Sequence, residues 1–247
     1  MIKSLIGDFY LKNFSSNRLE RIWKLAQIDF KKRYYDDKLG MFWALLNPIL
    51  QVAIYYFVFS TVMNRGEEDF ALFLFVGLVF WTTFMIGTKQ GINTFRTKRY
   101  LIENIQFNKI DLFFSHSISV FIGFLFNLGA YLVAATVYGI KFSFFTAFFG
   151  GILLTAIVFI LIFGSTLVLS TLSITLKDIN HIWDFSLLCG FWTAGIFFPA
   201  AKIVEKLSII QYINPFLGLI ENARRILMYN QELDLNFLVI NLSLIHI

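Results

Sequence analysis

Long runs of apolar residues recur along the chain, separated by shorter polar segments. A helix needs roughly 20 apolar residues to cover a hydrocarbon core of about 30 Å, so five of these runs are long enough to cross a bilayer. The five lie at about residues 41–62, 70–88, 112–138, 144–172 and 182–200. Backbone groups in hydrocarbon must bond to each other, so the runs predict helices and an all-α, polytopic membrane protein.

A sixth apolar run begins near Leu235 and reaches only Ile247. We interpret it as a spanning helix cut short, and a short interfacial helix is the alternative. The expected architecture is therefore six transmembrane helices, the last truncated, in a single domain over residues 1–247.

The region at about 15–37 has apolar residues at helical spacing within a basic surround. Its apolar stripe consists of Leu19, Ile22, Trp23, Ala26 and Phe30. A basic helix with an aromatic stripe is typical of helices that lie in the headgroup plane, so we predict an amphipathic interface helix here.

Residues 201–234 contain two apolar stripes at helical spacing, separated by Asn214-Pro215. Because the residue before a proline disfavours helical geometry, the pattern predicts two short amphipathic helices rather than one span. Their charged residues, among them Glu221 and Arg224, are expected on the faces opposite the apolar stripes.

Composition agrees with a lipid environment. Hydrophobic residues make up 57% of the 247 residues and charged residues 15%, against about 25% in soluble domains. This excludes an ordinary soluble enzyme, a disordered chain and a nucleic-acid-binding module. The single cysteine and the three separated histidines predict no metal site.

The distribution of lysine and arginine predicts the orientation. Fifteen of the 21 basic residues lie before the first span or in the connections from the second to the third and from the fourth to the fifth. The positive-inside rule places these segments, and the N-terminus, in the cytoplasm.

Motifs for chemistry are scarce. The sequence has no phosphate-binding loop of the G-x-x-x-x-G-K-[ST] type, so we expect no bound nucleotide, and no catalytic triad stands out. An integral-membrane enzyme or assembly factor would have to use His116, Asp111 or Asp184. We favour the interpretation that these are polar residues at helix ends.

Aromatic residues gather in the outer halves of the first and fifth spans. They include Tyr55, Tyr56, Phe59, Phe191, Trp192 and Phe198. Rings along a path could line a conduit for sugars or apolar chains, and a lipid-facing aromatic belt is the alternative.

The segment Gln27–Leu50 resembles the N-terminal signature of type-2 ABC exporter permeases, in the subgroup that exports bacterial polysaccharides such as O-antigen, capsule and teichoic acid. The matching residues are Asp29, Phe30, Arg33, Tyr34, Leu39, Gly40, Trp43, Ala44, Leu45, Asn47 and Pro48. Later matches follow in family order at Leu101, Ile102 and Phe107, at Lys177-Asp178-Ile179, at Phe191-Trp192-Thr193 with Pro199, and at Tyr212, Asn214-Pro215, Glu221 and Arg224.

The resemblance implies a permease subunit in the bacterial cytoplasmic (inner) membrane. It implies a second copy of the chain and a separate cytoplasmic ABC ATPase that binds the ATP, so the chain itself would be no enzyme. Coupling to the ATPase is expected from Arg33, Tyr34, Leu101, Ile102 and Phe107. The outer gate is expected from Tyr212, Asn214, Pro215, Glu221 and Arg224, and the aromatic residues above become candidates for the substrate path.

The cargo implied by the resemblance is a polysaccharide or lipid-linked glycan. Two alternatives stay open at this point: the same fold exporting a drug, peptide or lipid, and the membrane enzyme or assembly factor described above.

Overall fold

A computed structural model describes residues 18–34, 40, 42–62 and 69–243 of the chain. In this part of the chain the regular secondary structure is entirely helical. Four helices are long and apolar enough to cross a membrane. They are α3 (Phe42–Tyr56) with its π-helical continuation η1 (Phe57–Val62), α4 (Phe70–Gly91), α7 (Ile110–Val137) and α8 (Phe144–Thr175). The first four predicted spans are thus present as helices, with bounds shifted by at most three residues.

The fifth predicted span, 182–200, is wrong in its second half. Helix α9 runs from Ile179 to Thr193, and its 15 residues cover about 22 Å at 1.5 Å per residue. A turn follows instead, in which Gly195 has φ +80° and Pro199 precedes the next helix. The turn was missed because its residues are as apolar as the helix before it, so hydropathy does not separate them.

The sixth span stays a prediction. Helix α13 (Leu235–Leu242) has eight residues, and residues 244–247 lie outside the described part of the chain. The total of six spanning helices is therefore not established by these helices.

The interface helix exists as α2 (Arg18–Tyr34), but its predicted stripe is wrong in part. Ile22, Ala26 and Phe30 are buried together with Leu25, whereas Leu19 and Trp23 are exposed. The buried stripe packs against α7, so α2 has one apolar face for the protein and a second one available to lipid.

The region after α9 forms three short helices rather than two. They are α10 (Ala200–Lys206), α11 (Ile210–Ile213) and α12 (Pro215–Leu227). The predicted break at Asn214-Pro215 is confirmed, since Asn214 caps α12 and Pro215 is its first residue. Two further short helices, α5 (Thr94–Thr97) and α6 (Arg99–Asn104), connect α4 to α7.

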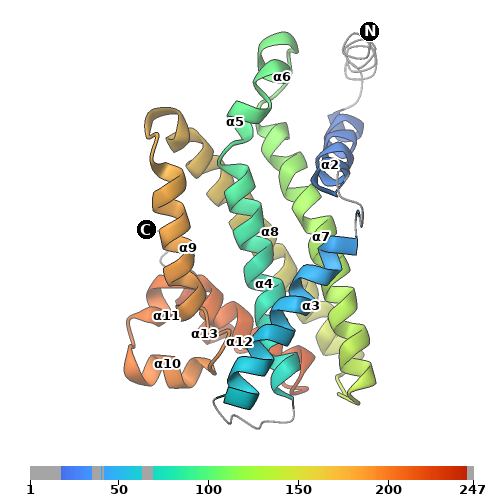
Figure 1. The fold of residues 1–247 in the computed structure, drawn as a ribbon, viewed down its shortest axis with the longest axis vertical. Coiled ribbons are helices and arrows are strands. Elements are labelled where there is room, and N and C mark those ends of the chain that lie inside the picture. Colours follow the sequence, from blue (N-terminus) through green and yellow to red (C-terminus); the bar gives the residue numbers. More distant parts are fainter. Residues whose placement is uncertain (1–17, 35–39, 41, 63–68, 244–247) are drawn as a thin grey trace.

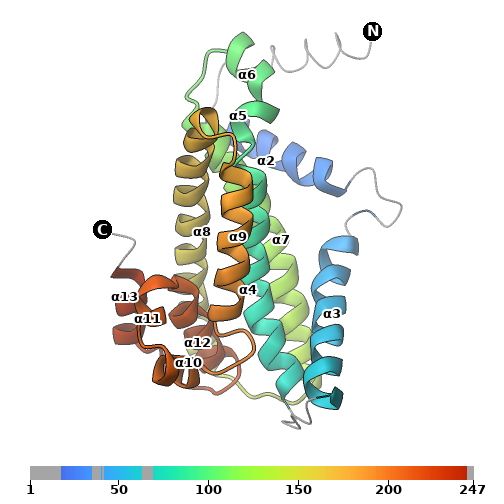
Figure 2. The same ribbon diagram turned by 60° about the vertical axis from the view of Figure 1, so that its left-hand side comes forward.

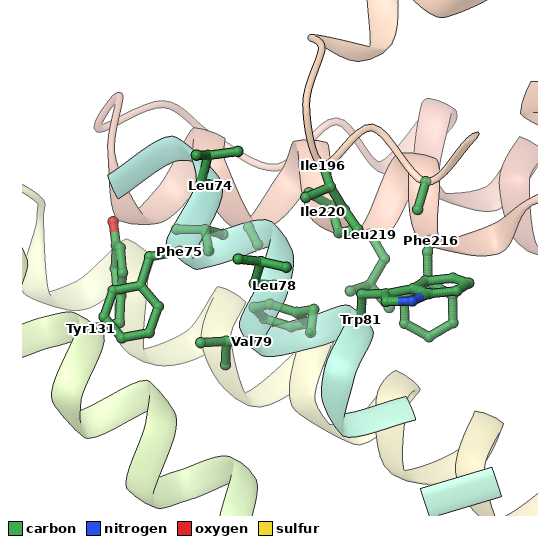
Figure 3. Packing of buried hydrophobic residues seen from close by; sticks show 14 of the residues in the cluster. Leu74, Phe75, Leu78, Val79, Trp81, Tyr131, Ile196, Phe216, Leu219 and Ile220 are labelled. Atoms are coloured by element: carbon green, nitrogen blue, oxygen red, sulfur yellow. The ribbon is translucent and has the colours of Figure 1, made fainter. Parts of the chain in front are cut away.

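Helix α4 forms the centre of the bundle. Figures 1 and 2 show it among α3, α7, α8 and α9, with α5, α6 and α2 at one end and α10 to α13 toward the other. We call these the α6 end and the α12 end. Apolar residues cover α4 all round, as expected for a buried helix. Figure 3 shows its side chains packed against α7 and α12. The ring centres of Trp81 on α4 and Phe216 on α12 are 5.2 Å apart.

Close packing of α4 depends on glycine. A Cβ placed on Gly91 would lie 2.1 Å from Cγ2 and 2.7 Å from Cβ of Thr166 on α8, so the two helices meet where no side chain fits. By contrast, a Cβ on Gly164 of α8 would meet no atom within 4 Å. Small residues allow such close approach between helices in lipid, where van der Waals contact drives association.

We therefore expect Gly91→Ala to destabilise the fold by about 1–3 kcal/mol, because the α4–α8 contact must open. Gly164→Ala, a matched change on α8, should be neutral or stabilise by up to about 1 kcal/mol, since alanine is the better helix former. Thermal unfolding of the purified variants in detergent measures both. Equal unfolding temperatures would contradict the close approach at Gly91.

Candidate functional site

At the α6 end, three of the five predicted coupling residues come together. Leu101, Ile102 and Phe107 pack against Leu25 of α2 and Leu112 of α7, and these five residues are called the coupling cluster below. The Arg21 guanidinium lies 5.6 Å from the centre of the Phe107 ring. The segment that carries α6 is thereby joined to α2 and α7 by apolar and cation–π contact.

The two remaining coupling candidates, Arg33 and Tyr34, are not members of the coupling cluster. Arg33 donates from Nη2 to Oγ of Ser119 at 3.3 Å, so it connects α2 to the first half of α7. The side chain of Tyr34 lies outside the described residues.

A buried carboxylate beside the coupling cluster holds α2 in place. Asp111, at the start of α7, is 1% exposed and accepts from Arg18 at 2.9 Å and from Arg21 at 2.8 Å. Lys98 forms a second ion pair with Asp29 of α2. The sequence feature that could have indicated this pairing is the one-turn spacing of Arg18 and Arg21, because it lets both side chains reach the same carboxylate.

Helix α6 is stabilised within its own turn. Arg99 donates from Nε to Glu103 at 2.6 Å, an i,i+4 pair on an exposed face. This hydrogen bond, with the charge of the same carboxylate, raises the pKa of the Arg99 guanidinium above its ordinary value, so Arg99 stays charged.

At the α12 end, the aromatic candidates of the first and fifth spans meet around a residue that the site prediction left out. Phe197, in the turn after α9, is buried, and its ring centre lies between 5.0 and 5.3 Å from those of Tyr55, Phe59, Phe191 and Trp192. With Phe198, which lies 6.4 Å from Phe59, these residues form what we call the aromatic cluster.

Tyr56 and Trp192 lie differently from the rest of the aromatic candidates. Tyr56 is exposed, because it follows Tyr55 on the helix and points to another face. Trp192 stacks on Phe197 at 29° and is still 55% exposed, so part of its indole is free of protein contact.

Two of the predicted gate residues tie α12 to its neighbours: Asn214 to the end of α9 and Glu221 to the start of α10. Asn214 donates from Nδ2 to the Gly190 carbonyl and to Oγ1 of Thr193, both at 2.9 Å. Glu221 accepts from the backbone N–H of Ala200 at 3.2 Å. Pro215 begins α12, and Tyr212 of α11 is exposed.

Arg224 contradicts the prediction that the charged residues of α12 lie opposite its apolar face. Its side chain is 1% exposed and points into the bundle. The guanidinium donates to the carbonyl oxygens of Gly195 at 2.7 Å, Ile196 at 2.9 Å and Phe73 at 3.1 Å, and lies 3.3 Å above the Phe73 ring. Gly77 provides the room, since a Cβ there would lie 3.1 Å from Nη2. Arg224 thus supplies donors for the turn that ends α9.

The polar residues considered for a membrane enzyme have partners within the protein. Asp111 binds two arginines, and Asp184 forms a half-exposed ion pair with Lys89 at 2.8 Å. His116 is buried, with Nε2 2.8 Å from the Gly87 carbonyl. The three do not share a hydrogen bond or ion pair among the described contacts, which favours structural roles.

Comparison with known proteins gives a consistent result. The profile of the ABC-2 type transporter family matches residues 20–228. An O-antigen export system permease protein RfbA of Myxococcus xanthus is 27% identical over 82% of this chain and 78% of its own length. One of Klebsiella pneumoniae is 29% identical over 81% and 77%. The polysialic acid transport protein KpsM of Escherichia coli is 22% identical over 85% and 83%.

Replacing the carboxylate at the α6 end should loosen α2. Asp111→Asn removes the negative charge that pairs with the largely buried Arg21, so we expect a loss of about 2–3 kcal/mol in the docking of α2. Asp184→Asn is the matched control, since both partners of its ion pair are about half exposed and such pairs contribute about 0–1 kcal/mol.

Hydrogen exchange of the backbone amides in α2 measures this directly. Residues 18–34 should exchange faster in Asp111→Asn and at the unchanged rate in Asp184→Asn. Equal protection of α2 in both variants would remove Asp111 from this role.

Removing the guanidinium at the α12 end should destabilise the fold. Arg224→Met leaves the carbonyls of Gly195 and Ile196 without donors, and each unsatisfied buried group costs about 1–3 kcal/mol. Arg225→Met should cost about 1 kcal/mol or less, because Arg225 donates to the backbone carbonyl of Glu232 in an exposed hydrogen bond. Thermal unfolding in detergent compares the two, and an Arg224→Met variant as stable as Arg225→Met would refute the assignment.

Proposed function

Because this chain belongs to the ABC-2 type transporter family, we propose that it is the membrane-spanning permease subunit of an exporter of polysaccharide or lipid-linked glycan. The observation that carries the proposal is the family match over residues 20–228 together with relatives named for O-antigen export and polysialic acid transport. These relatives favour a glycan over a drug, a peptide or a lipid as the cargo. The export direction is out across the bacterial cytoplasmic membrane.

Energy comes from a separate cytoplasmic ABC ATPase that binds and hydrolyses ATP. The α6 end suits its docking, because α2 and the segment from Arg96 to Lys109 at this end are rich in basic residues, which the positive-inside rule places in the cytoplasm. Movement of the ATPase against α6 would pass through the coupling cluster to α2 and α7.

The substrate path is proposed along α3 and α9, whose rings meet in the aromatic cluster. Ring faces suit the CH surfaces of sugars, and they hold a moving chain without strong hydrogen bonds that would stop it. The gate residues Asn214, Glu221 and Arg224 fix the turn and the short helices at the far end of this path.

A second copy of the chain would complete the path. Helix α3 and η1 leave most of their surface uncovered within one chain, including Ile54, Phe57 and Val62. Helix α9 likewise exposes Phe185 and Leu188. These apolar faces flank α4, so a partner copy packed there would enclose the space between the two chains.

The function is tested by deleting the gene for this chain in the bacterium that carries it. Surface glycan, measured by antibody or lectin labelling of intact cells, should disappear while glycan accumulates inside. The purified chain alone should hydrolyse no ATP, and hydrolysis should appear with its ATPase partner. Normal surface glycan in the deletion strain, or ATP hydrolysis by the chain alone, would overturn the proposal.

Phe107→Ala should uncouple ATP hydrolysis from export. The ring joins the α6 segment to Leu25 and Arg21, and a loss of about 1.4 kcal/mol in the coupled step slows export about tenfold. ATP hydrolysis by the complex should persist. Phe144→Ala, an exposed phenylalanine at the α12 end, is the control and should export normally. Unchanged export in Phe107→Ala would remove Phe107 from coupling.

A further inference from the structure

A groove of about 680 Å³ opens beside the aromatic cluster at the α12 end. Its volume falls within the range of about 300–1,000 Å³ that is typical of small-molecule sites. One wall consists of rings from η1, α9 and the turn after α9, and the other consists of α10 with the start of α11. Figure 2 shows α10 and α11 near the end of α9, and residues of all three helices line the groove.

The ring wall is both fixed and accessible. Phe59 is buried and packs against Phe197 and Phe198, which sets the position of the wall. Trp192 and Phe198 are 55% and 40% exposed, so both present ring surface to the groove. An amphipathic ring face of this kind binds the apolar CH face of a sugar.

The opposite wall carries charge. Lys202 and Lys206 lie one turn apart on α10, with Glu205 beside them, and all three line the groove and are exposed. Neither lysine forms a salt bridge with another described residue. The two ammonium groups are thus available to an anion, and the Glu205 carboxylate can accept hydrogen bonds from sugar hydroxyls.

We propose that this groove binds an anionic sugar unit of the exported glycan, with the ring wall against the sugar and Lys202 and Lys206 on its carboxylate or phosphate. The proposal rests on the proposed function and deepens it by naming the class of cargo. The sugar is favoured over a lipid headgroup because the rings and the lysines face each other across one groove, which fits a ring that carries its charge at the edge.

The test uses the full chain in nanodiscs of phosphatidylcholine and ligand-observed NMR titration. The probes are a trimer of galacturonic acid and the neutral trimer of galactose, which differ in the carboxylates alone. The acidic trimer should bind more tightly than the neutral one. The double variant Lys202→Gln/Lys206→Gln should weaken acidic binding about tenfold and leave neutral binding unchanged.

Three controls separate charge from ring contact. Lys141→Gln removes an exposed lysine from the connection between α7 and α8, outside the groove lining, and should change neither titration. Trp192→Ala should weaken both trimers, because both use the ring wall. High salt should remove the preference for the acidic trimer in the wild-type chain.

Equal affinity for the two trimers, or an unaffected double variant, would overturn the proposal. If neither trimer binds, but phosphatidylglycerol added to the nanodiscs binds in a way that depends on the two lysines, the groove is a site for a lipid headgroup. That result would also overturn the proposal. These results do not depend on export, so the proposed function fails separately, through normal surface glycan in the deletion strain.

Discussion

Backbone carbonyls at a helix end need donors, and in a membrane protein these must come largely from the protein itself. Helix α9 ends at Thr193, well short of a full crossing, and the turn after it exposes the carbonyls of Gly195 and Ile196 to the interior of the bundle. The guanidinium of Arg224 satisfies them, and its planar fork reaches α4 at the same time through the Phe73 carbonyl. A short α9, a turn lined by rings, and a buried α12 all depend on this one set of hydrogen bonds.

At the α6 end, ion pairs compensate a buried polar group. Asp111 is buried where α7 begins, and Arg18 and Arg21 compensate it from α2. Helix α7 then continues to the α12 end, where the hydroxyl of Tyr131 donates to the Leu227 carbonyl at 3.2 Å. One helix therefore contacts both the coupling cluster and the helix that carries Arg224. This helix runs beside the close-packed α4.

Hydropathy was sufficient to predict the four long spans, because length in an apolar run is set by the bilayer and not by details of packing. It failed at residues 194–200, where a turn is as apolar as the helix before it.

The amphipathic pattern of α12 was real, but it predicted Arg224 on a polar face together with Arg225. Sequence spacing could not show that buried carbonyl groups lie close to Arg224. The stripe of α2 was misjudged for a related reason: Leu19 and Trp23 are apolar residues that stay exposed, and the sequence does not separate lipid-facing from protein-facing positions. The resemblance placed Phe107, Leu101 and Ile102 correctly in one region, but Leu25 and Asp111 became evident only when α2 was seen against α7.

The groove at the α12 end lies on the part of the chain that departs most from regular helices. Its ring wall is rigid, because Phe197 and Phe59 hold Trp192 and Phe198 from behind and Arg224 fixes the turn. Its charged wall lies on α10, a seven-residue helix whose two lysines are exposed. Substitutions on α10 can therefore alter which charges face a sugar without disturbing the bundle. If the proposed function and the proposed sugar site hold, the long helices form the path, and the short α10 segment supported by them determines which cargo the path favours.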